Sequence, residues 1–379
     1  MSGRLRTLEI EQVARIALGA TLLGAGGGGD PYISLLATRQ IYANGARKAN
    51  LIRLSELDDD AQVICVAGFG APTVEKERLF ELSHLSHAVR TLEKHIGRKA
   101  DALIPAEMGG CNALIPIVAA SECGLPVIDG DGMGRAFPEL QMTSFSLRGI
   151  SAAPFVMTDE HLNTVICQSK DNKKGDALAR AVCMGMGLFC FLSAYPMTGR
   201  EAKRVAIPST VTLAYALGRA IENAKTGAAP IESLLERIRA SAEGIDVVRL
   251  FDGKVADVWR STERGFVIGW LDLAPLNGAS HSARIEFRNE YLAFTLDGAP
   301  RALTPDLICV VDSETAEPIP TPDIRYGQRV AVLGLSCHPI FRTERALKVV
   351  GPEAFGMDYS YRPLKELGAA RAEECRARA

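Results

Sequence analysis

The sequence predicts an α/β N-terminal domain with an open, mostly parallel sheet, followed by a mainly β C-terminal domain that forms a sandwich or a distorted barrel. Over the first 170 residues, short apolar strands alternate with segments of helical period, which is typical of a sheet with helices on its faces. After residue 240, short β-rich segments follow one another, separated by turn signals such as Asn289-Glu290 and Asp297-Gly298. The length of 379 residues also favours two domains over one.

The elements follow in a regular order along the chain. A helix with apolar residues at 3.6-residue spacing is expected over residues 8–23, and Asp30-Pro31 starts a second helix, with Asp30 as the cap and Pro31 at the first helical position. We expect four parts: an α/β domain at 1–170 with glycine-rich ligand loops, a helical connector at 171–240 packing on it, a β domain at 241–365 and a frayed tail at 366–379. The connector helices are expected near 175–192 and 209–225.

Composition and charge exclude several classes of function. The chain is 47% hydrophobic and 23% charged with a net charge of −2, and no half of it is basic, so we expect no nucleic-acid partner. It shows no signal peptide and no apolar stretch long enough for a membrane span. We therefore expect a cytoplasmic homo-oligomer with reduced cysteines, which binds a small-molecule substrate and no membrane.

The first candidate site is the glycine-rich loop after the first helix. It contains G-x-G-x-x-G, but a helix precedes it where the dinucleotide fingerprint needs a strand, so no nucleotide cofactor is expected. Consecutive glycines let a ligand or another backbone approach closely, and a tight helix–helix junction is the alternative. The substrate-binding candidates here are Gly26, Gly27, Gly28, Gly29 and Asp30, the last of which is otherwise a helix cap.

A second candidate loop runs from Pro105 to Asn112, after a short buried strand and at the start of a helix. Ligands of open α/β sheets bind at the carboxyl ends of strands, so Glu107 could act as a base there. Backbone N–H groups of Gly109 and Gly110 could serve an anion, and Asn112 could bind substrate. The alternative is that Glu107 is solvated or caps the helix.

A third loop follows another strand and carries Asp129, Asp131 and Arg135 among glycines. Two carboxylates at this spacing suit a hard cation, and Asp131 is a second candidate for the base. Arg135 either binds substrate or pairs with an aspartate in a solvated turn. With a fourth glycine turn at residues 68–72, the four loops could converge on one crevice, which is the strongest argument from the residues alone.

The β domain offers one further candidate pair, Cys337 and His338. Both are catalytic candidates, and together with Asp129 and Asp131 they are tentative ligands for a divalent metal, Zn or Mg. In a strand adjacent side chains point to opposite faces, so a core cysteine beside a surface histidine is the alternative. We expect residues 336–339 to pack over the mouth of the crevice, because ligand sites favour domain interfaces.

Three of these motifs and a C-terminal one resemble a known family. They are the segments 23–32, 107–112 and 129–139, together with Gly351-Pro352 and residues 355–359. The chain is similar here to the S-methyl thiohydantoin desulfurase family, formerly an uncharacterised bacterial family associated with hydantoinase/oxoprolinase proteins. The resemblance implies hydrolysis of an S-methylated thiohydantoin to a hydantoin with loss of methanethiol.

Two functions follow from the residues and the resemblance together. The leading hypothesis is a hydrolase that adds water to a ring carbon flanked by two nitrogens, with Glu107 or Asp131 as base, or with a metal that activates the water. The competing hypothesis rests on the association of family members with hydantoinase/oxoprolinase proteins. It is that the chain is a non-catalytic partner subunit of such an enzyme.

Overall fold

The computed structural model describes residues 5–45, 47–71, 74, 83–242, 244–263, 266–276 and 280–367. Three predictions from the sequence fall wholly or partly outside these ranges. They are Pro72 of the fourth glycine turn, residues 75–82 of a helix expected over 74–95, and residues 368–379 of the tail.

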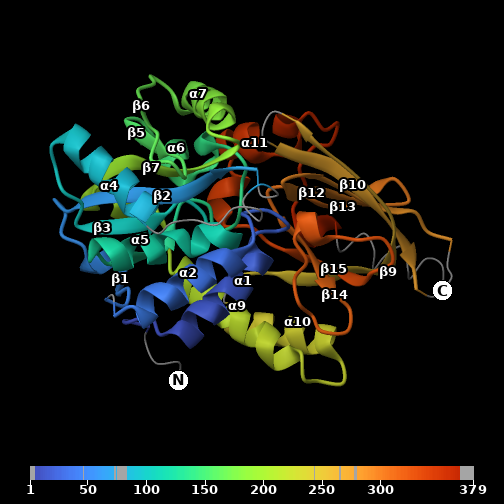
Figure 1. Cartoon of the computed structure of the whole chain (residues 1–379). Coiled ribbons are helices and arrows are strands. Elements are labelled where there is room, and N and C mark those ends of the chain that lie inside the picture. Colours follow the sequence, from blue (N-terminus) through green and yellow to red (C-terminus); the bar gives the residue numbers. More distant parts are fainter. Residues whose placement is uncertain are drawn as a thin grey trace.

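The N-terminal domain is built on a mixed sheet of eight strands (Figure 1). Seven strands lie in the order β1-β4-β3-β2-β7-β5-β6, and β8 pairs with β4 at one end. The first four of that order are parallel, and the other pairings are antiparallel. The bounds are β1 Leu51–Arg53, β2 Gln62–Gly70, β3 Ala102–Pro105, β4 Val127–Asp131, β5 Phe155–Thr158, β6 Thr164–Cys167, β7 Phe189–Thr198 and β8 Ile207–Pro208.

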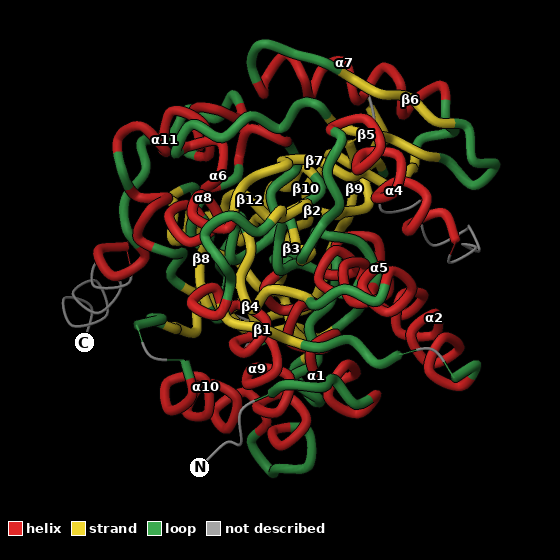
Figure 2. Tube along the Cα trace, turned by 90° about the vertical axis from the view of Figure 1, so that its left-hand side faces the viewer, coloured by secondary structure: helices red, strands yellow, loops and turns green. Residues whose placement is uncertain are grey.

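Helices cover both faces of this sheet, which confirms the predicted α/β class (Figure 2). Alternate residues of β2 point to opposite faces: Ile64 and Val66 join one apolar cluster, and Val63 and Cys65 the other. The first cluster holds α1 (Ile10–Leu23), α2 (Pro31–Ala43), α4 (Ser83–Ile96), α5 (Ile115–Cys123), α9 (Thr210–Ala224) and α10 (Pro230–Ser241). The second holds α6 (Ser144–Leu147), α7 (Asn172–Gly185) and α8 (Gly199–Val205).

Strand β7 lies inside the segment 171–240, where helices were expected. The helix predicted to reach Leu192 ends at Gly185, and β7 follows at Phe189 and pairs with both β2 and β5. Gly187 and Leu188 between them have positive φ, which breaks the helix. A continuous apolar run such as residues 188–192 does not distinguish a buried strand from a buried helix, so periodicity could not locate this change.

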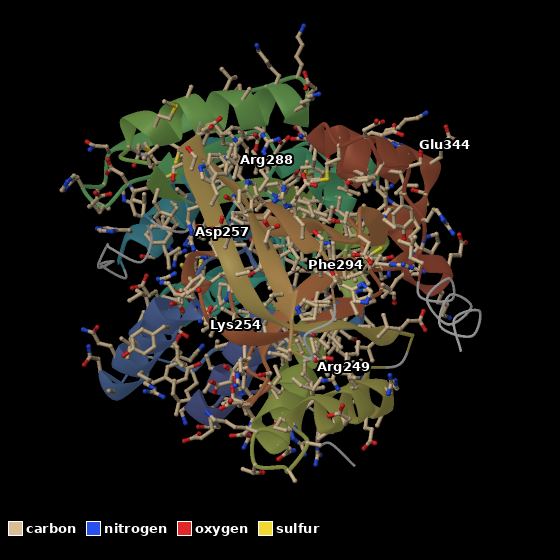
Figure 3. The ribbon with its side chains drawn as sticks, turned by 90° about the vertical axis from the view of Figure 1, so that its right-hand side faces the viewer. Arg249, Lys254, Asp257, Arg288, Phe294 and Glu344 are labelled. Atoms are coloured by element: carbon tan, nitrogen blue, oxygen red, sulfur yellow. The ribbon has the colours of Figure 1, made fainter. Side chains whose placement is uncertain are left out.

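The C-terminal domain is a single antiparallel sheet of seven strands in the order β13-β12-β11-β10-β9-β15-β14. The sheet curls into a half-barrel, so that β12 and β13 contact β14 across it. Figure 3 views this domain from outside, with Lys254 and Asp257 on β9. The bounds are β9 Val247–Glu263, β10 Phe266–Pro275, β11 Ala283–Arg288, β12 Glu290–Leu296, β13 Ala299–Leu303, β14 Leu307–Asp312 and β15 Arg329–Leu335, followed by α11 at Glu344–Val350.

The mainly β prediction is therefore confirmed, with one curled sheet in place of a sandwich. The two domains also share apolar core. Leu307 and Cys309 of β14 and Leu333 of β15 belong to the same cluster as α1 and α9. Within the described ranges, no helix is long and apolar enough to cross a membrane.

Candidate functional site

A cavity of about 80 Å³ lies at the carboxyl ends of β2 and β3, and we call it the first cavity. The C-terminal domain closes one side of it with Asn289 and Glu290. Its other walls come from the glycine loop, the loop after β3 and the loop after β4. The polar lining side chains include Glu107, Asn112, Glu139, Thr143, Arg180, Tyr195, Asn289 and Glu290.

Glu107 is held in one orientation at the wall of the first cavity. It is 5% exposed; its Oε1 accepts a hydrogen bond from Asn112 Nδ2 at 2.7 Å and its Oε2 accepts one from Phe137 N at 3.0 Å. Asn112 is fixed in turn, because its Oδ1 accepts from Gly68 N at 2.7 Å. The carboxylate thus has one donor on each oxygen, and the Asn112 amide can present only its nitrogen to it.

Burial dominates the protonation of Glu107. It raises the pKa of this carboxyl to about 7, although the Asn112 and Phe137 donors oppose the shift, and the negative charge of Asp131 adds to it. A carboxyl with such a pKa exchanges protons near neutral pH, which is the property required of a general base or acid.

Glu290, the first residue of β12, brings a second carboxyl to the same cavity. It is 2% exposed, and its Oε2 has no hydrogen-bond partner among the described residues. Burial raises its pKa to about 8, and the next largest cause is the charge of Glu107. The two carboxyls therefore titrate as an interacting pair in which both are rarely ionised together.

Arg180 of α7 lines the first cavity, and Arg288 of the C-terminal domain lies next to its lining residue Glu139. Arg180 stacks on Phe266 at 3.8 Å and on Phe69 at 4.9 Å, while its Nε contacts Asp176 Oδ2 at 2.9 Å. Arg288 stacks on Phe266 at 4.0 Å and lies 3.7 Å from Glu139. The rim therefore combines apolar surface with positive charge next to the two buried carboxyls.

The glycine loop forms backbone hydrogen bonds with segments of both domains. The carbonyl of Gly28 accepts from Cys111 N at 2.9 Å, and those of Ala25 and Gly26 accept from Tyr291 N at 2.7 Å and Thr321 N at 2.9 Å in the other domain. A Cβ at Gly28 would lie 2.5 Å from the Gly109 carbonyl. Because the glycines of this loop lack side chains, the segments around Cys111, Tyr291 and Thr321 can approach the loop backbone to distances that a Cβ would prevent.

The candidates in these two glycine segments separate into two groups. Gly28 and Gly29 line the first cavity, whereas Gly26 and Gly27 do not; a Cβ at Gly27 would lie 2.1 Å from Glu290 Oε1. Gly109 and Gly110 also lie outside the lining and pack on Ala136 and on the Gly29 carbonyl. Asp30 accepts from Tyr32 N at 2.9 Å, so the structure places it as the N-cap of α2.

Asp129 and Asp131 lie behind the walls of the first cavity. Both oxygens of Asp129 are taken by Thr212, which donates from N at 3.0 Å and from Oγ1 at 2.6 Å, so Asp129 caps α9. Asp131 is fully buried, and its Oδ2 accepts from Met133 N at 3.1 Å and Gly134 N at 2.7 Å. Burial raises the pKa of Asp131 to about 7, but its position favours a role in shaping the loop.

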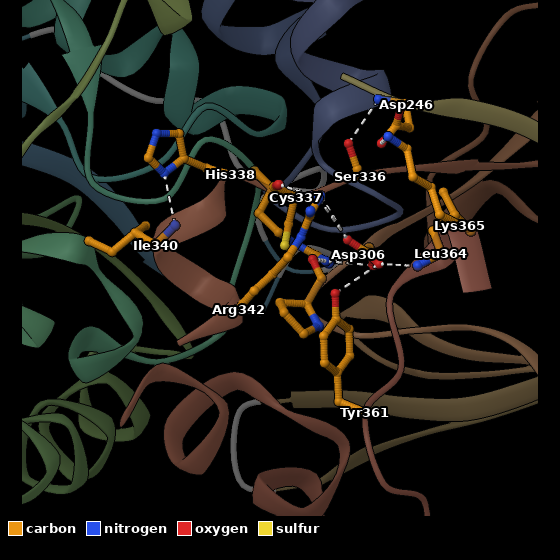
Figure 4. A network of polar contacts seen from close by, with 12 residues as sticks. Asp246, Asp306, Ser336, Cys337, His338, Ile340, Arg342, Tyr361, Leu364 and Lys365 are labelled. Atoms are coloured by element: carbon orange, nitrogen blue, oxygen red, sulfur yellow. Dashed lines mark hydrogen bonds and ion pairs between the residues drawn. The ribbon is translucent and has the colours of Figure 1, made fainter. Parts of the chain in front are cut away.

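Cys337 and His338 line a different cavity of about 420 Å³, which we call the second cavity. The two side chains point apart: Cys337 lies beside the buried Asp306, whose oxygens accept from Cys337 N, Tyr361 Oη and Leu364 N, while His338 turns the other way (Figure 4). Burial raises the pKa of the Cys337 thiol to about 12, so it is a neutral thiol at pH 7.

The structure therefore differs from the expected single crevice. No described residue lines both cavities, and residues 336–339 contribute to the second one instead of closing the first. The four tentative metal ligands are not brought together, and among the described residues no three His, Cys, Asp or Glu side chains are placed to hold a metal ion. Arg135 contacts carbonyls of the C-terminal domain and no aspartate carboxylate: Nη1 donates to Pro305 O at 2.6 Å and to Asp306 O at 3.0 Å.

Sequence reasoning missed Glu290 and Arg180. Asn289-Glu290 was interpreted as a turn between strands, and only Asn289 has the positive φ of a turn residue. A signal was present, because Glu290 begins a strand whose next five residues are all buried. A charged residue at the start of so apolar a strand is a candidate for a buried functional group.

Comparisons with known proteins give two findings. Models of the S-Me-THD-like N-terminal and C-terminal domains match residues 11–169 and 170–364. A crystal structure of a protein from Chromobacterium violaceum shares the fold with a TM-score of 0.76, at 21% identity, and covers 94% of this chain and 99% of that one. No curated protein sequence matches the chain significantly.

Proposed function

This chain belongs to the S-methyl thiohydantoin desulfurase (S-Me-THD)-like family, and from that premise we propose that it is a hydrolase that releases methanethiol from an S-methyl thiohydantoin-type ring. One observation carries the proposal. Two buried carboxyls, Glu107 and Glu290, come from different domains to one cavity, and the pKa of each is raised close to neutrality. Such pairs supply an acid and a base at the same pH.

The surroundings of the two carboxyls suggest which is the base. Glu107 accepts a hydrogen bond on each oxygen, and such donors favour the ionised form. Glu290 Oε2 has no donor among the described residues, and its pKa is the higher of the two, which favours the protonated form. We assign Glu107 as the base for water and Glu290 as the acid.

The proposed reaction balances with these two groups alone. Glu107 takes a proton from water, the hydroxide oxygen bonds to the ring carbon that carries sulfur, and Glu290 protonates the adjacent ring nitrogen as the C=N electron pair moves there. The tetrahedral centre then collapses. Its hydroxyl proton returns to Glu290, the C–S bond breaks, and the proton on Glu107 passes to sulfur. The products are a hydantoin and methanethiol, and both carboxyls regain their starting states.

The size of the first cavity limits how the ring can sit. Its volume of about 80 Å³ is roughly half of the ~150 Å³ that holds benzene in an engineered cavity. The reacting carbon and methylthio group would lie inside, between Glu107 and Glu290. The rest of the substrate would lie at the rim, against Phe69 and Arg180.

The test is methanethiol release by the purified full-length chain from an S-methyl thiohydantoin, measured with a thiol reagent. Wild type and the exposed control Glu344→Gln should turn over alike, whereas Glu107→Gln and Glu290→Gln should lose activity while folded. Full activity in both variants would overturn the assignment. A wild-type chain that is inactive alone but active with a hydantoinase-like protein would favour the partner-subunit alternative.

A further inference from the structure

We propose that the second cavity is a binding site for a small carboxylate with an apolar body, a ligand distinct from the ring handled at the first cavity. Its volume of about 420 Å³ falls in the range of roughly 300–1,000 Å³ that small-molecule sites occupy. It lies between the domains, with walls from β8, the start of α9, the end of α10 and the segment after β15. Nothing in the proposed hydrolysis uses it.

The charges around the second cavity are of one sign. None of the described residues that line it is an aspartate or glutamate, whereas the Arg135 cation is present; His338 also lines it, but its lowered pKa favours the neutral imidazole. The first cavity has three carboxyls in its lining, Glu107, Glu139 and Glu290. A cavity with a cation and no acid in its walls favours an anionic ligand over a neutral or cationic one.

Arg135 is a buried cation that no described carboxylate contacts directly, although the charges of Glu290 and Asp306 act on it from further away. It is 0% exposed; its Nε donates to Ala136 O at 2.9 Å and its Nη1 to two carbonyls of the C-terminal domain. No described carboxylate lies within ion-pair distance, and Nη2 has no hydrogen-bond partner there. A buried charge in this state is costly, so an anion that reached Nη2 would recover that cost.

Three aspartates near the second cavity accept hydrogen bonds from other groups, although Asp131 Oδ1 has no partner among the described residues. Asp129 is taken by Thr212, Asp131 Oδ2 by the backbone of its own loop, and Asp306 by Cys337 N, Tyr361 and Leu364. Positive charge also reaches the mouth of the cavity. Partial burial first, and then the charges of Arg148 and Arg342, lower the pKa of His338.

The remaining lining defines the rest of the ligand. Thr210 is buried in the lining, and its hydroxyl lies beside the Asp131 carboxyl, so it adds a polar group to the wall of the cavity. Most other walls are apolar, from Leu23, Ile207, Leu213, Ala216, Leu307 and Leu335. Because Arg135 is fully covered, the head group reaches Nη2 only after side chains in the cavity wall move, and Ser209 and His338 are exposed residues of that wall. A planar carboxylate matches the guanidinium fork.

Benzoate is a suitable probe, with benzamide as its neutral isostere. Titration calorimetry on the full chain should show benzoate binding roughly tenfold tighter than benzamide, because a charge-assisted hydrogen bond is about twice as strong as a neutral one. A crystal soaked with 4-iodobenzoate should show the iodine in the second cavity. Equal affinity for benzamide, no binding at millimolar benzoate, or iodine only in the first cavity would each overturn the proposal.

Two variants complete the test. Arg135→Gln should abolish the preference for benzoate over benzamide. Because Arg135 also joins the domains and its loss could impair folding, Ala216→Phe on α9 gives an independent measure by filling the cavity. Asn223→Phe, at an exposed position of the same helix, is the matched control and should bind benzoate like wild type. Undiminished benzoate binding by Ala216→Phe would contradict the assignment.

Activity toward the thiohydantoin is not an outcome of this test. The proposal of a carboxylate site can therefore fail independently of the proposed hydrolysis.

Discussion

The two cavities take part of their walls from one loop, the segment after β4, yet they are built for different tasks. Met133 and Phe137 of this loop line the first cavity, and Gly134 and Arg135 line the second. The first is small and contains two buried carboxyls, Glu107, which is fixed by hydrogen bonds, and Glu290, as proton transfer requires. The second is larger, mostly apolar and basic, as recognition of an anion requires. Chemistry-bearing residue types close together in sequence can therefore serve separate sites.

The largest expected effect separates Glu107 from Asp131. Both are buried carboxyls at strand ends with a pKa of about 7, but only Glu107 lines the first cavity. Glu107→Gln should lower kcat by about 10²- to 10⁴-fold, the usual contribution of a general base, while Asp131→Asn should lower it less than about tenfold. Steady-state kinetics of methanethiol release, with folding checked by circular dichroism, decides this. An equal loss in both variants would show that the cavity lining does not identify the base.

The second expected effect is on stability and compares one glycine from each cavity. Alanine at Gly28 combines positive φ with a Cβ 2.5 Å from the Gly109 carbonyl, whereas a Cβ at Gly134 meets nothing closer than 3.5 Å. We expect Gly28→Ala to cost about 2–4 kcal/mol of unfolding free energy and Gly134→Ala about 1 kcal/mol. Gly45→Ala, with positive φ and nothing within 4 Å, is the control for backbone strain alone. Urea unfolding measures the stability of all three variants. Similar losses of unfolding free energy at Gly28 and Gly45 would refute a steric role for the close contact between Gly28 and Gly109.

A smaller effect concerns the pH dependence of stability. Because the folded-state pKa of Glu290 is raised from 4.5 to about 8, its contribution to stability is present below the unfolded pKa and is lost as pH rises through about 8. Glu107, raised to about 7, acts in the same direction. The free energy of unfolding should therefore fall between about pH 5 and pH 9, and Glu290→Gln should reduce that slope. A wild-type stability that rises over this range would contradict the burial of these carboxyls.

The smallest expected effect is in the pH profile of kcat/KM. Activity should need ionised Glu107 and protonated Glu290, which gives a bell with limbs near pH 7 and 8 that belong to the coupled pair. Removing the acid with Glu290→Gln should leave residual activity without the alkaline limb. Persistence of that limb in the variant would assign it to another group.

Local signals in the sequence identified part of the first cavity. Glu107 and Asn112 were found because they follow a buried strand, and strand ends in an α/β sheet face the ligand. Asp129 and Asp131 also follow a buried strand. However, Thr212 of α9 donates hydrogen bonds to Asp129, and backbone N–H groups of the loop donate to Asp131. Elements far away in the sequence decide what covers a strand end. The same sequence pattern therefore placed Glu107 in the cavity lining and left Asp129 and Asp131 outside it.

Contacts between the domains could not be read from the sequence. Glu290 reaches Gly27 and the neighbourhood of Glu107 only because the curled sheet packs on the glycine loop. The same loop was expected to approach either a ligand or another backbone. The structure shows the backbone contact, because the Gly28 carbonyl accepts a hydrogen bond from Cys111 N, and it places Gly28 and Gly29 in the lining of the first cavity. Propensity and periodicity report on local structure, so they do not identify which distant residues meet.

The position of β7 has a consequence for synthesis on the ribosome. β7 pairs with β2 on one side and β5 on the other, yet it follows all the other strands of that path in the chain. Until residues 189–198 emerge, the nascent chain exposes the apolar edge of β2, and the β5–β6 hairpin has no sheet to join. Unpaired edges of this kind invite association with other chains. A gene truncated at the boundary between the two matched family domains should therefore yield an insoluble product, and co-translational folding of the first sheet must wait for sequence from the second.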